Sequence, residues 1–142
     1  MVDEPRVLRL LARIETDVAS LAGFAGHDVG GLLEDDVAVD AIKYRFITAI
    51  EGCTKVAHHL AEAEGWPPAE TNADAVRRLG TEGVVPAEVA ASVADAVGFR
   101  NLLVHRYAEV DDRLALSHLD RLEDLRRFTS TVARWMTLRR DS

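Results

Sequence analysis

The stretch DVAVDAIKYRFITAIEGCTKVAHHLAEAE, residues 36–64, decides the fold of this chain. Its apolar residues recur at steps of three and four, the spacing that places side chains on one face of an α-helix. This stripe consists of Val39, Ile42, Phe46, Ile50, Cys53, Val56 or Ala57, and Leu60. Asp35 or Asp36 can cap its start, and Gly65, Pro67 and Pro68 end the pattern. The stretch therefore predicts a buried helix of about seven turns.

The rest of the chain shows the same periodicity in shorter segments. Helices are expected over residues 5–21, 72–80 and 86–105, and a last helix is expected to end near residue 139. A loop is expected over residues 23–31, and a turn at Asp111 and Asp112. Strong period-two alternation, the mark of a strand, is absent. The predicted fold class is all-α: a single domain over residues 1–142, built as a bundle of four long helices plus one short helix.

Local signals set the expected ends and faces of these helices. Asn72 is the expected N-cap of the short helix, and Gly80 is its expected stop signal. Ser117 and Asp120 form a capping-box pattern before the last helix. The inner face of that last helix is expected to comprise Leu122, Leu125, Phe128, Val132 and Trp135.

Composition restricts the kinds of function that the chain can have. The formal charge is −7, and non-specific nucleic-acid binding depends mainly on Lys and Arg, so any such contact must rest on a few placed cations. The single cysteine, Cys53, excludes an intramolecular disulfide and is expected to be a small buried side chain. Residues 1–13 lack the apolar core of a signal peptide, and no apolar run approaches the ~18 residues of a membrane span. We expect a cytoplasmic protein without membrane contact.

The stretch RNLLVHRY, residues 100–107, places polar groups on a helix that otherwise reads as buried. Arg100 falls near the centre of that helix's apolar stripe, and Asn101 and His105 are neighbours just beyond its edge. A cation there costs several kcal/mol unless it is paired or hydrated. Arg100 could pair with a carboxylate such as Glu51, or reach water at the helix end. The stripe itself comprises Val89, Val93, Ala96 and Leu103, with Val97 and Val104 on one edge.

A functional interpretation requires an anion at this position. An arginine presents a fork of N–H groups that matches phosphate, and a histidine can give and take protons near neutral pH. Together, Arg100 and His105 could hydrolyse RNA without a metal, with a 2′-hydroxyl attacking the phosphorus. One histidine per chain is few for a reaction that needs both an acid and a base. A two-fold dimer would supply two of each group.

At these residues the chain resembles the HEPN superfamily, and within it the HepT-like ribonuclease toxins. The HepT pattern is Arg, four residues, His, any residue, Tyr, which here matches Arg100, His105 and Tyr107, with the polar Asn101 after the arginine. The apolar filling of the gap and the turn EVDD at 109–112 are also typical. Residues 45–60 resemble the long second helix of the family, and residues 71–86 its short helix and following turn. The resemblance covers roughly residues 5 to 138.

The resemblance implies a function and a partner. HEPN domains are helical bundles that form homodimers, with the motif helices facing each other across a cleft for RNA. HepT toxins cut RNA without a metal or cofactor, and an MntA-like nucleotidyltransferase antitoxin silences them by transferring AMP to the motif tyrosine. By this match Arg100 and His105 are catalytic, Asn101 supports them and Tyr107 is the modification site. Arg106 departs from relatives, where acidic or other polar residues are common, and is interpreted as an added cation for binding the RNA substrate.

Other interpretations use the same residues differently. A non-catalytic HEPN module could bind a nucleotide or the partner nucleotidyltransferase through the same groove, and a purely structural dimer would need neither activity. His58 and His59 are adjacent on a helix and cannot chelate one metal, and His59 is expected to form a hydrogen bond within the bundle. His27 and His118 are expected to be solvated. The arginine-rich last helix is interpreted as a solvated face, or alternatively as a rim that guides RNA or docks an acidic partner.

Overall fold

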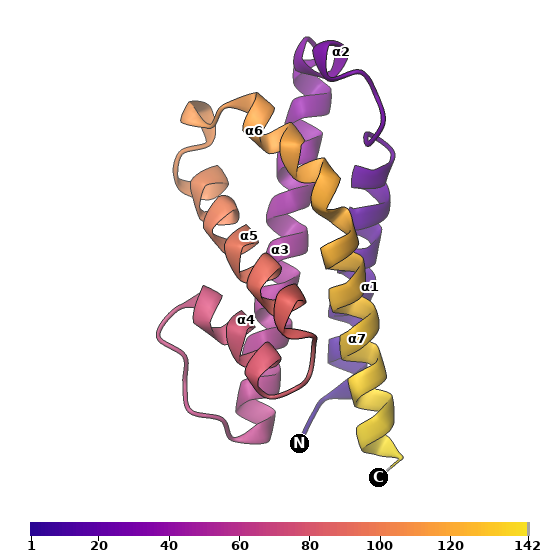
Figure 1. Ribbon diagram of the computed structural model, residues 1–142, viewed down its shortest axis with the longest axis vertical. Helices are drawn as coiled ribbons and strands as arrows, with labels where there is room; N and C mark the ends of the chain where they lie inside the picture. The colour runs from indigo at the N-terminus through magenta and orange to yellow at the C-terminus, as the bar shows by residue number, and fades with distance from the viewer. Residues whose placement is uncertain (142) are drawn as a thin grey trace.

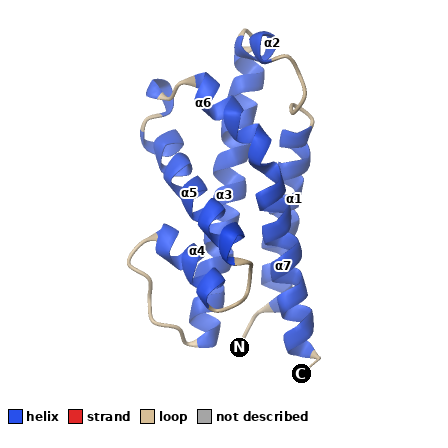
Figure 2. Ribbon diagram, in the orientation of Figure 1, coloured by secondary structure: helices blue, strands red, loops and turns tan. Residues whose placement is uncertain are grey.

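The computed structural model describes residues 1–141, and Ser142, the last residue of the predicted domain, lies outside them. Every regular element within these residues is helical (Figure 2). In chain order the elements are α1 (Glu4–Ala22), α2 (Val29–Leu33), α3 (Asp36–Glu64), α4 (Asn72–Thr81), α5 (Ala87–His105), the 3-10 helix η1 (Tyr107–Glu109), α6 (Asp112–Ser117), the 3-10 helix η2 (His118–Arg121) and α7 (Leu122–Arg140).

The four long helices α1, α3, α5 and α7 run alternately up and down the molecule (Figure 1). α1 packs against α3 and α7, and α5 packs against α3, α4 and α7. The short helices α2 and α6 lie together at the end of the bundle opposite the two termini. The predicted all-α class is confirmed. The predicted helix count is wrong, because residues 1–141 contain two further short α-helices and two 3-10 turns.

α3 forms as its sequence predicts. The Asp35 side chain accepts a hydrogen bond from the Ala38 backbone N–H at 3.1 Å and so caps the helix. Gly65 ends it in the left-handed conformation, with φ of 71°. All the residues of the predicted stripe are buried, including Cys53. At Gly52 a Cβ atom would lie 2.7 Å from Ile14 Cγ1, so the absence of a side chain lets α1 approach α3 closely.

α4 begins and ends differently from the prediction. Its N-cap is Thr71, whose hydroxyl accepts from the Asp74 backbone N–H at 3.0 Å, and the predicted cap Asn72 instead hydrogen-bonds His58 Nε2 at 2.8 Å. Both residue types can cap a helix, and the docking of α4 beside α3 decides between them.

Gly80 is not the stop signal of α4, because the helix continues to Thr81. A Cβ atom at Gly80 would lie 2.8 Å from the Ala90 Cβ, so this glycine serves the close packing of α4 on α5. The left-handed glycine after the helix is Gly83, with φ of 76°. Two glycines three residues apart therefore have different roles that the local sequence does not distinguish.

The segments expected to be irregular contain additional short helices. Asp28 caps α2 within the predicted loop, and Asp111 caps α6 where a turn was expected, because each aspartate accepts from a backbone N–H two or three residues later. The predicted capping box is wrong: the Ser117 hydroxyl donates to the Leu114 carbonyl at 2.6 Å, and α7 starts at Leu122 without a side-chain cap.

The apolar core is continuous along the bundle and draws on all four long helices. On α7 the predicted inner face is buried except for Trp135, which lies half-buried at its margin while Met136 is buried instead. The buried carboxylate of Asp17 is satisfied by Arg45 at 3.0 Å and by the Thr48 hydroxyl at 2.6 Å. None of the helices within residues 1–141 combines the length and apolar character needed to cross a membrane.

Candidate active site

Arg100 lies in the last turns of α5 and is held from two sides. Its Nε and one terminal nitrogen donate to the same Glu51 oxygen, at 3.2 and 2.7 Å, and its other terminal nitrogen donates to Asn101 Oδ1 at 3.1 Å. The Arg100 side chain is 23% exposed and that of Glu51 34%. Of the two alternatives that the sequence left open for Arg100, the structure shows the pairing with Glu51. The guanidinium is thus fixed in orientation, and part of the Arg100 side chain remains in contact with water.

His105 is the last residue of α5, and its side chain is exposed. Within residues 1–141 no hydrogen bond or ion pair engages the imidazole. It lies one helical turn after Asn101, so the two side chains are neighbours on one helix face. Arg100, Asn101 and His105 therefore form one solvent-facing group at the end of α5.

Tyr107, at the start of η1, contacts α3 across a gap of 67 residues in sequence. Its hydroxyl donates to Asp40 Oδ1 at 2.6 Å, and the Lys43 ammonium lies 4.6 Å from the centre of its ring. Lys43 is buried and pairs with Asp112 at 2.7 Å. Partial burial, the hydrogen bond to Asp40 and the charges of Asp40 and Asp112 raise the pKa of Tyr107 to about 12.

The surface beside these groups is partly apolar. Leu102 is 44% exposed and Val104 42% exposed, so the prediction that Val104 lies at the edge of the buried stripe is wrong. Gly98 is also exposed, and a Cβ atom there would have no neighbour within 4 Å. Arg106 extends from the end of α5 into solvent, 3.8 Å from Glu109. The motif end of α5 thus presents cations, an imidazole and uncovered apolar side chains on the outside of the bundle.

Sequence reasoning missed Asp40 and Lys43, which hold Tyr107 in place. A partial signal was available. Asp40, Tyr44 and Glu51 recur at steps of four and seven on α3, the spacing of residues on one helix face. Since Glu51 pairs with Arg100 on that face, Asp40 points toward the same flank of the bundle three helical turns earlier.

His59 and His118 contact other parts of the bundle. His59 Nε2 accepts from the Asp3 backbone N–H at 3.0 Å, which confirms its expected hydrogen bond within the bundle. The expectation that His118 is solvated is wrong, because its ring stacks on Phe99 with 3.8 Å between the ring centres. Burial and the charge of Arg121 lower the pKa of His118. Within residues 1–141 no three His, Cys, Asp or Glu side chains gather in a group that could hold a metal ion.

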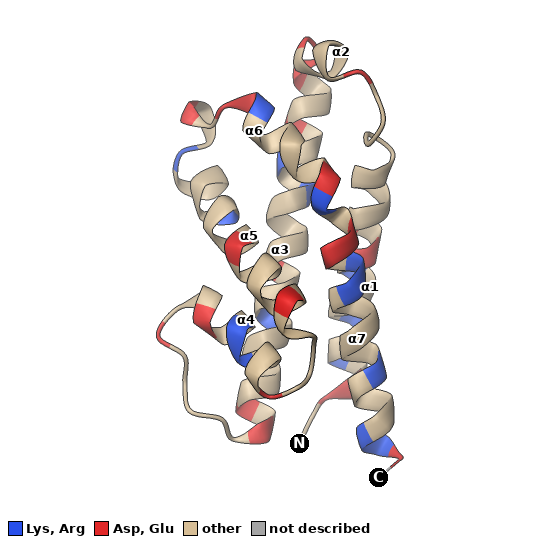
Figure 3. Cartoon of the chain, viewed as in Figure 1, with Lys and Arg blue, Asp and Glu red and all other residues tan. Residues whose placement is uncertain are grey.

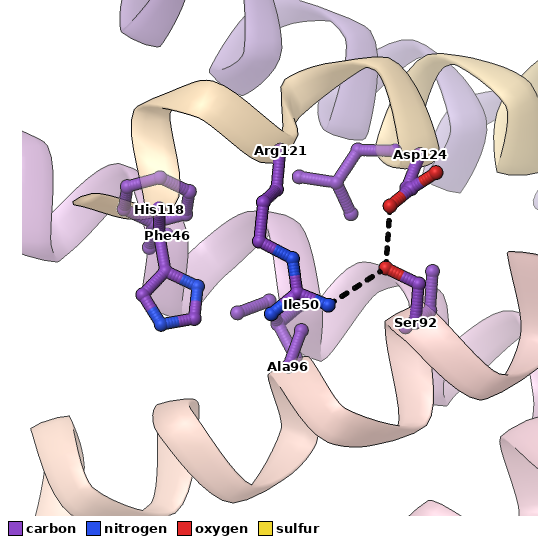
Figure 4. Close-up of a pocket in the computed structure, with 9 residues that line it drawn as sticks. Phe46, Ile50, Ser92, Ala96, His118, Arg121 and Asp124 are labelled. Carbon is purple, nitrogen blue, oxygen red and sulfur yellow. Dashed lines mark hydrogen bonds between the residues drawn. The ribbon is translucent and has the colours of Figure 1, made fainter. Parts of the chain in front are cut away.

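A second polar cluster lies between α5 and α7, next to His118 (Figure 4). The Ser92 hydroxyl donates to Asp124 at 2.5 Å and accepts from Arg121 at 3.1 Å. The cavity that these residues line has a volume of only about 20 Å³, room for about one water molecule. The cluster therefore joins two helices and offers no space for a substrate.

The arginines of the last helix are largely paired with acidic residues, and charges of both signs lie along α7 (Figure 3). Arg126 lies 3.7 Å from Glu123 on the same helix, and Arg127 lies 2.9 Å from Glu88 on α5. Further toward the C-terminus, Arg139 pairs with Glu64 and Arg140 with Glu4. These pairs agree with the interpretation of a solvated face.

The sequence of this chain is similar to that of known proteins. The model of the family described as Ribonuclease HepT-like matches residues 14–132. A protein of Archaeoglobus fulgidus named "Putative RNase" is 28% identical over 117 residues, which cover 82% of this chain and 84% of that protein.

Two solved structures share the fold. The tri-AMPylated HEPN toxin of Shewanella oneidensis, solved in complex with an MNT antitoxin, has a TM-score of 0.81 and 19% identity, over 94% of this chain and 99% of the toxin. The cytosolic protein YutE of Bacillus subtilis, described as of unknown function, has a TM-score of 0.84 and 16% identity, over 97% of this chain and 93% of YutE. At these identities the likeness establishes the fold alone.

Proposed function

This chain belongs to the Ribonuclease HepT-like family, and on that premise we propose that it is a metal-independent endoribonuclease toxin of a HepT/MntA-type pair. Two copies form the RNA cleft, and AMP transfer to Tyr107 silences the activity. The observation that carries this proposal is the Arg100 guanidinium held by Glu51 and Asn101, with the unengaged, exposed imidazole of His105 one turn beyond Asn101 on the same helix.

The proposed reaction follows from these groups. A guanidinium has five N–H donors. Three of those of Arg100 are used by Glu51 and Asn101, so two remain to hold a phosphodiester and stabilise the charge that builds up in the transition state. The RNA 2′-hydroxyl attacks the adjacent phosphorus, the bond from that phosphorus to the 5′-oxygen of the next nucleotide breaks, and a 2′,3′-cyclic phosphate forms. His105 of one copy takes the proton of the 2′-hydroxyl, and His105 of the other copy protonates the leaving 5′-oxygen. Asn101 orients the guanidinium, and Arg106 contacts a neighbouring phosphate. These steps need no metal, because arginine and histidine supply the charge and the proton transfer.

A homodimer provides the two histidines that an acid and a base require. The exposed Leu102 and Val104 give the motif end of α5 an apolar surface that a second copy would cover. Gly98, with open space where a side chain would lie, allows a close approach of another helix. If the α5 helices of two copies pair around a two-fold axis, the His105 imidazoles of both copies lie at the same dimer interface.

Modification of Tyr107 would block this cleft. The tyrosine is 39% exposed and lies two residues after His105. An attached AMP adds bulk and a negative phosphate where the RNA backbone must bind, and repulsion between the phosphates opposes binding. An MntA-like nucleotidyltransferase is the proposed partner, by analogy with the AMPylated toxin of Shewanella oneidensis.

The central test replaces the proposed proton-transfer group. His105→Ala should lower the rate of RNA cleavage by at least ~100-fold, the usual contribution of a general acid or base, and should abolish growth inhibition. Light scattering should show the same oligomer as in the unsubstituted protein. His27→Ala, at an exposed loop histidine, is the matched control and should cleave RNA normally. Equal cleavage by the two variants would remove His105 from the mechanism.

The alternative function is a non-catalytic module that binds a nucleotide or the nucleotidyltransferase through the same groove. The formal charge of −7 favours it, because an acidic protein repels the RNA backbone. Both functions use Arg100, and they differ at His105. Toxicity that survives His105→Ala while Arg100→Ala abolishes partner binding would support the alternative.

A further inference from the structure

The contact between Tyr107 and Asp40 carries an inference about how the modification itself proceeds. The Tyr107 hydroxyl donates to Asp40 Oδ1 at 2.6 Å, within the range of a charge-assisted O–H···O⁻ hydrogen bond. The phenolic proton therefore already points at a carboxylate of the same chain. Asp40 is exposed on α3 and belongs to the toxin itself, so any enzyme that modifies Tyr107 meets the hydroxyl with this acceptor in place.

The ring is held as firmly as the hydroxyl. Lys43 lies 4.6 Å from the ring centre, and the buried Lys43 is itself fixed by Asp112 at 2.7 Å. The cation–π contact and the hydrogen bond together fix the position of the phenolic oxygen relative to α3. The groups that face Tyr107 from the elements packed around it are Asp40 and Lys43 on α3 and Asp112 on α6.

Partial burial and the charged groups around Tyr107 keep its hydroxyl protonated, and a protonated phenol is a poor nucleophile. With a pKa of about 12, only a fraction on the order of 10⁻⁵ of the hydroxyl is ionised at pH 7. The proton must therefore move while the new bond forms, which requires a base within about 2.6–3.2 Å of the oxygen. Within residues 1–141, Asp40 is the acceptor that meets this distance.

We infer that Asp40 is the general base for the modification of its own chain. The Tyr107 oxygen attacks the α-phosphorus of a nucleoside triphosphate held by the partner enzyme, the bond from that phosphorus to the β-phosphate oxygen breaks, and pyrophosphate leaves. As the O–P bond forms, the phenolic O–H bond breaks and its proton passes to the Asp40 carboxylate, then to water. This inference rests on the proposed silencing of the toxin and deepens it.

The test measures AMP incorporation into Tyr107 by mass spectrometry. The full-length chain is mixed with the MntA-like nucleotidyltransferase of the same genome and ATP. Asp40→Asn keeps an oxygen acceptor of the same shape but removes the base, and it should lower the initial rate by ~100-fold or more. Asp40→Glu keeps a carboxylate and should recover part of that rate. Glu62→Gln, an exposed acidic residue on the same helix, is the matched control and should react at the unsubstituted rate.

The pH dependence separates a base from a positioning residue. With Asp40→Asn the reaction needs preformed phenolate, so its rate should rise about tenfold per pH unit between pH 7 and 9, while the unsubstituted protein should show a much flatter profile. A uniform loss with an unchanged profile would assign Asp40 a positioning role and overturn the inference, as would an Asp40→Asn rate within threefold of the unsubstituted one. No modification of the unsubstituted chain would remove the inference together with the proposed silencing.

Discussion

The pairing of Arg100 with Glu51 supports a prediction that can be tested without knowledge of the RNA substrate. The perturbation is a double-mutant cycle of Arg100→Met and Glu51→Gln. Each change removes the ion pair, Glu51→Gln retains the length of the side chain, and Arg100→Met retains the apolar stem of the arginine. Arg100 donates two hydrogen bonds to one Glu51 oxygen, at 3.2 and 2.7 Å, so the cycle isolates a single, well-defined contact.

The magnitude follows from the exposure of the pair. Exposed ion pairs contribute roughly 0.2–1 kcal/mol, and breaking a fully buried pair costs roughly 3–5 kcal/mol. The side chains here are 23% and 34% exposed, so water partly replaces a lost partner and screens the attraction. We expect a coupling energy of about 1–2 kcal/mol between these limits.

The assay is urea unfolding of the four proteins at two chain concentrations, because dimer formation adds to the apparent stability by mass action. A coupling energy below about 0.5 kcal/mol would refute the reasoning that Glu51 holds the guanidinium in place. Arg100→Leu should also be less stable than the unsubstituted protein. An increase in its stability would instead favour the purely structural interpretation of the dimer, since replacing a costly buried cation stabilises a fold.

Two further predictions concern packing and pH. Gly52→Ala should lower the free energy of unfolding by about 1 kcal/mol, because overpacking against Ile14 Cγ1 at 2.7 Å outweighs the gain in helix propensity. Gly98→Ala, with open space around its Cβ within one chain, should raise the free energy of unfolding of the monomer, measured at low chain concentration, by about 1 kcal/mol. Equal urea midpoints for Gly52→Ala and Gly98→Ala would contradict this reasoning. Folding lowers the pKa of His118, so the unfolded chain takes up a proton at this imidazole more readily than the folded one. The free energy of unfolding is therefore highest above about pH 6.5 and decreases as the pH falls below that value. His118→Gln should therefore lose less stability between pH 7.5 and pH 5 than the unsubstituted protein, measured by urea midpoints, and parallel losses would contradict the assignment.

Much of the candidate site could be predicted because its residues lie on one short stretch. Asn101 and His105 are one helical turn apart, so helical geometry alone makes them neighbours, and the observed pairing with Glu51 is one of the two alternatives that the sequence left open for Arg100. The cation stood out because it interrupts an apolar stripe, and Glu51 lies on the neighbouring long helix. Asp40 gave only the weak signal of its spacing from Glu51, since charged residues on the exposed part of a helix are ordinary, and the burial of Lys43 depends on how Tyr107 and Asp112 pack against α3.

The sequence by itself determined the long helices, the buried face of α3, its start at Asp35 or Asp36 and its end at Gly65. These features depend on interactions within a few residues, which periodicity and capping chemistry describe. The tertiary structure alone decided that Tyr107 meets Asp40, 67 residues away, and that His118 stacks on Phe99. Such contacts depend on how far the helices slide and rotate as they dock, and that is set by the packing of the whole core, which no local pattern records.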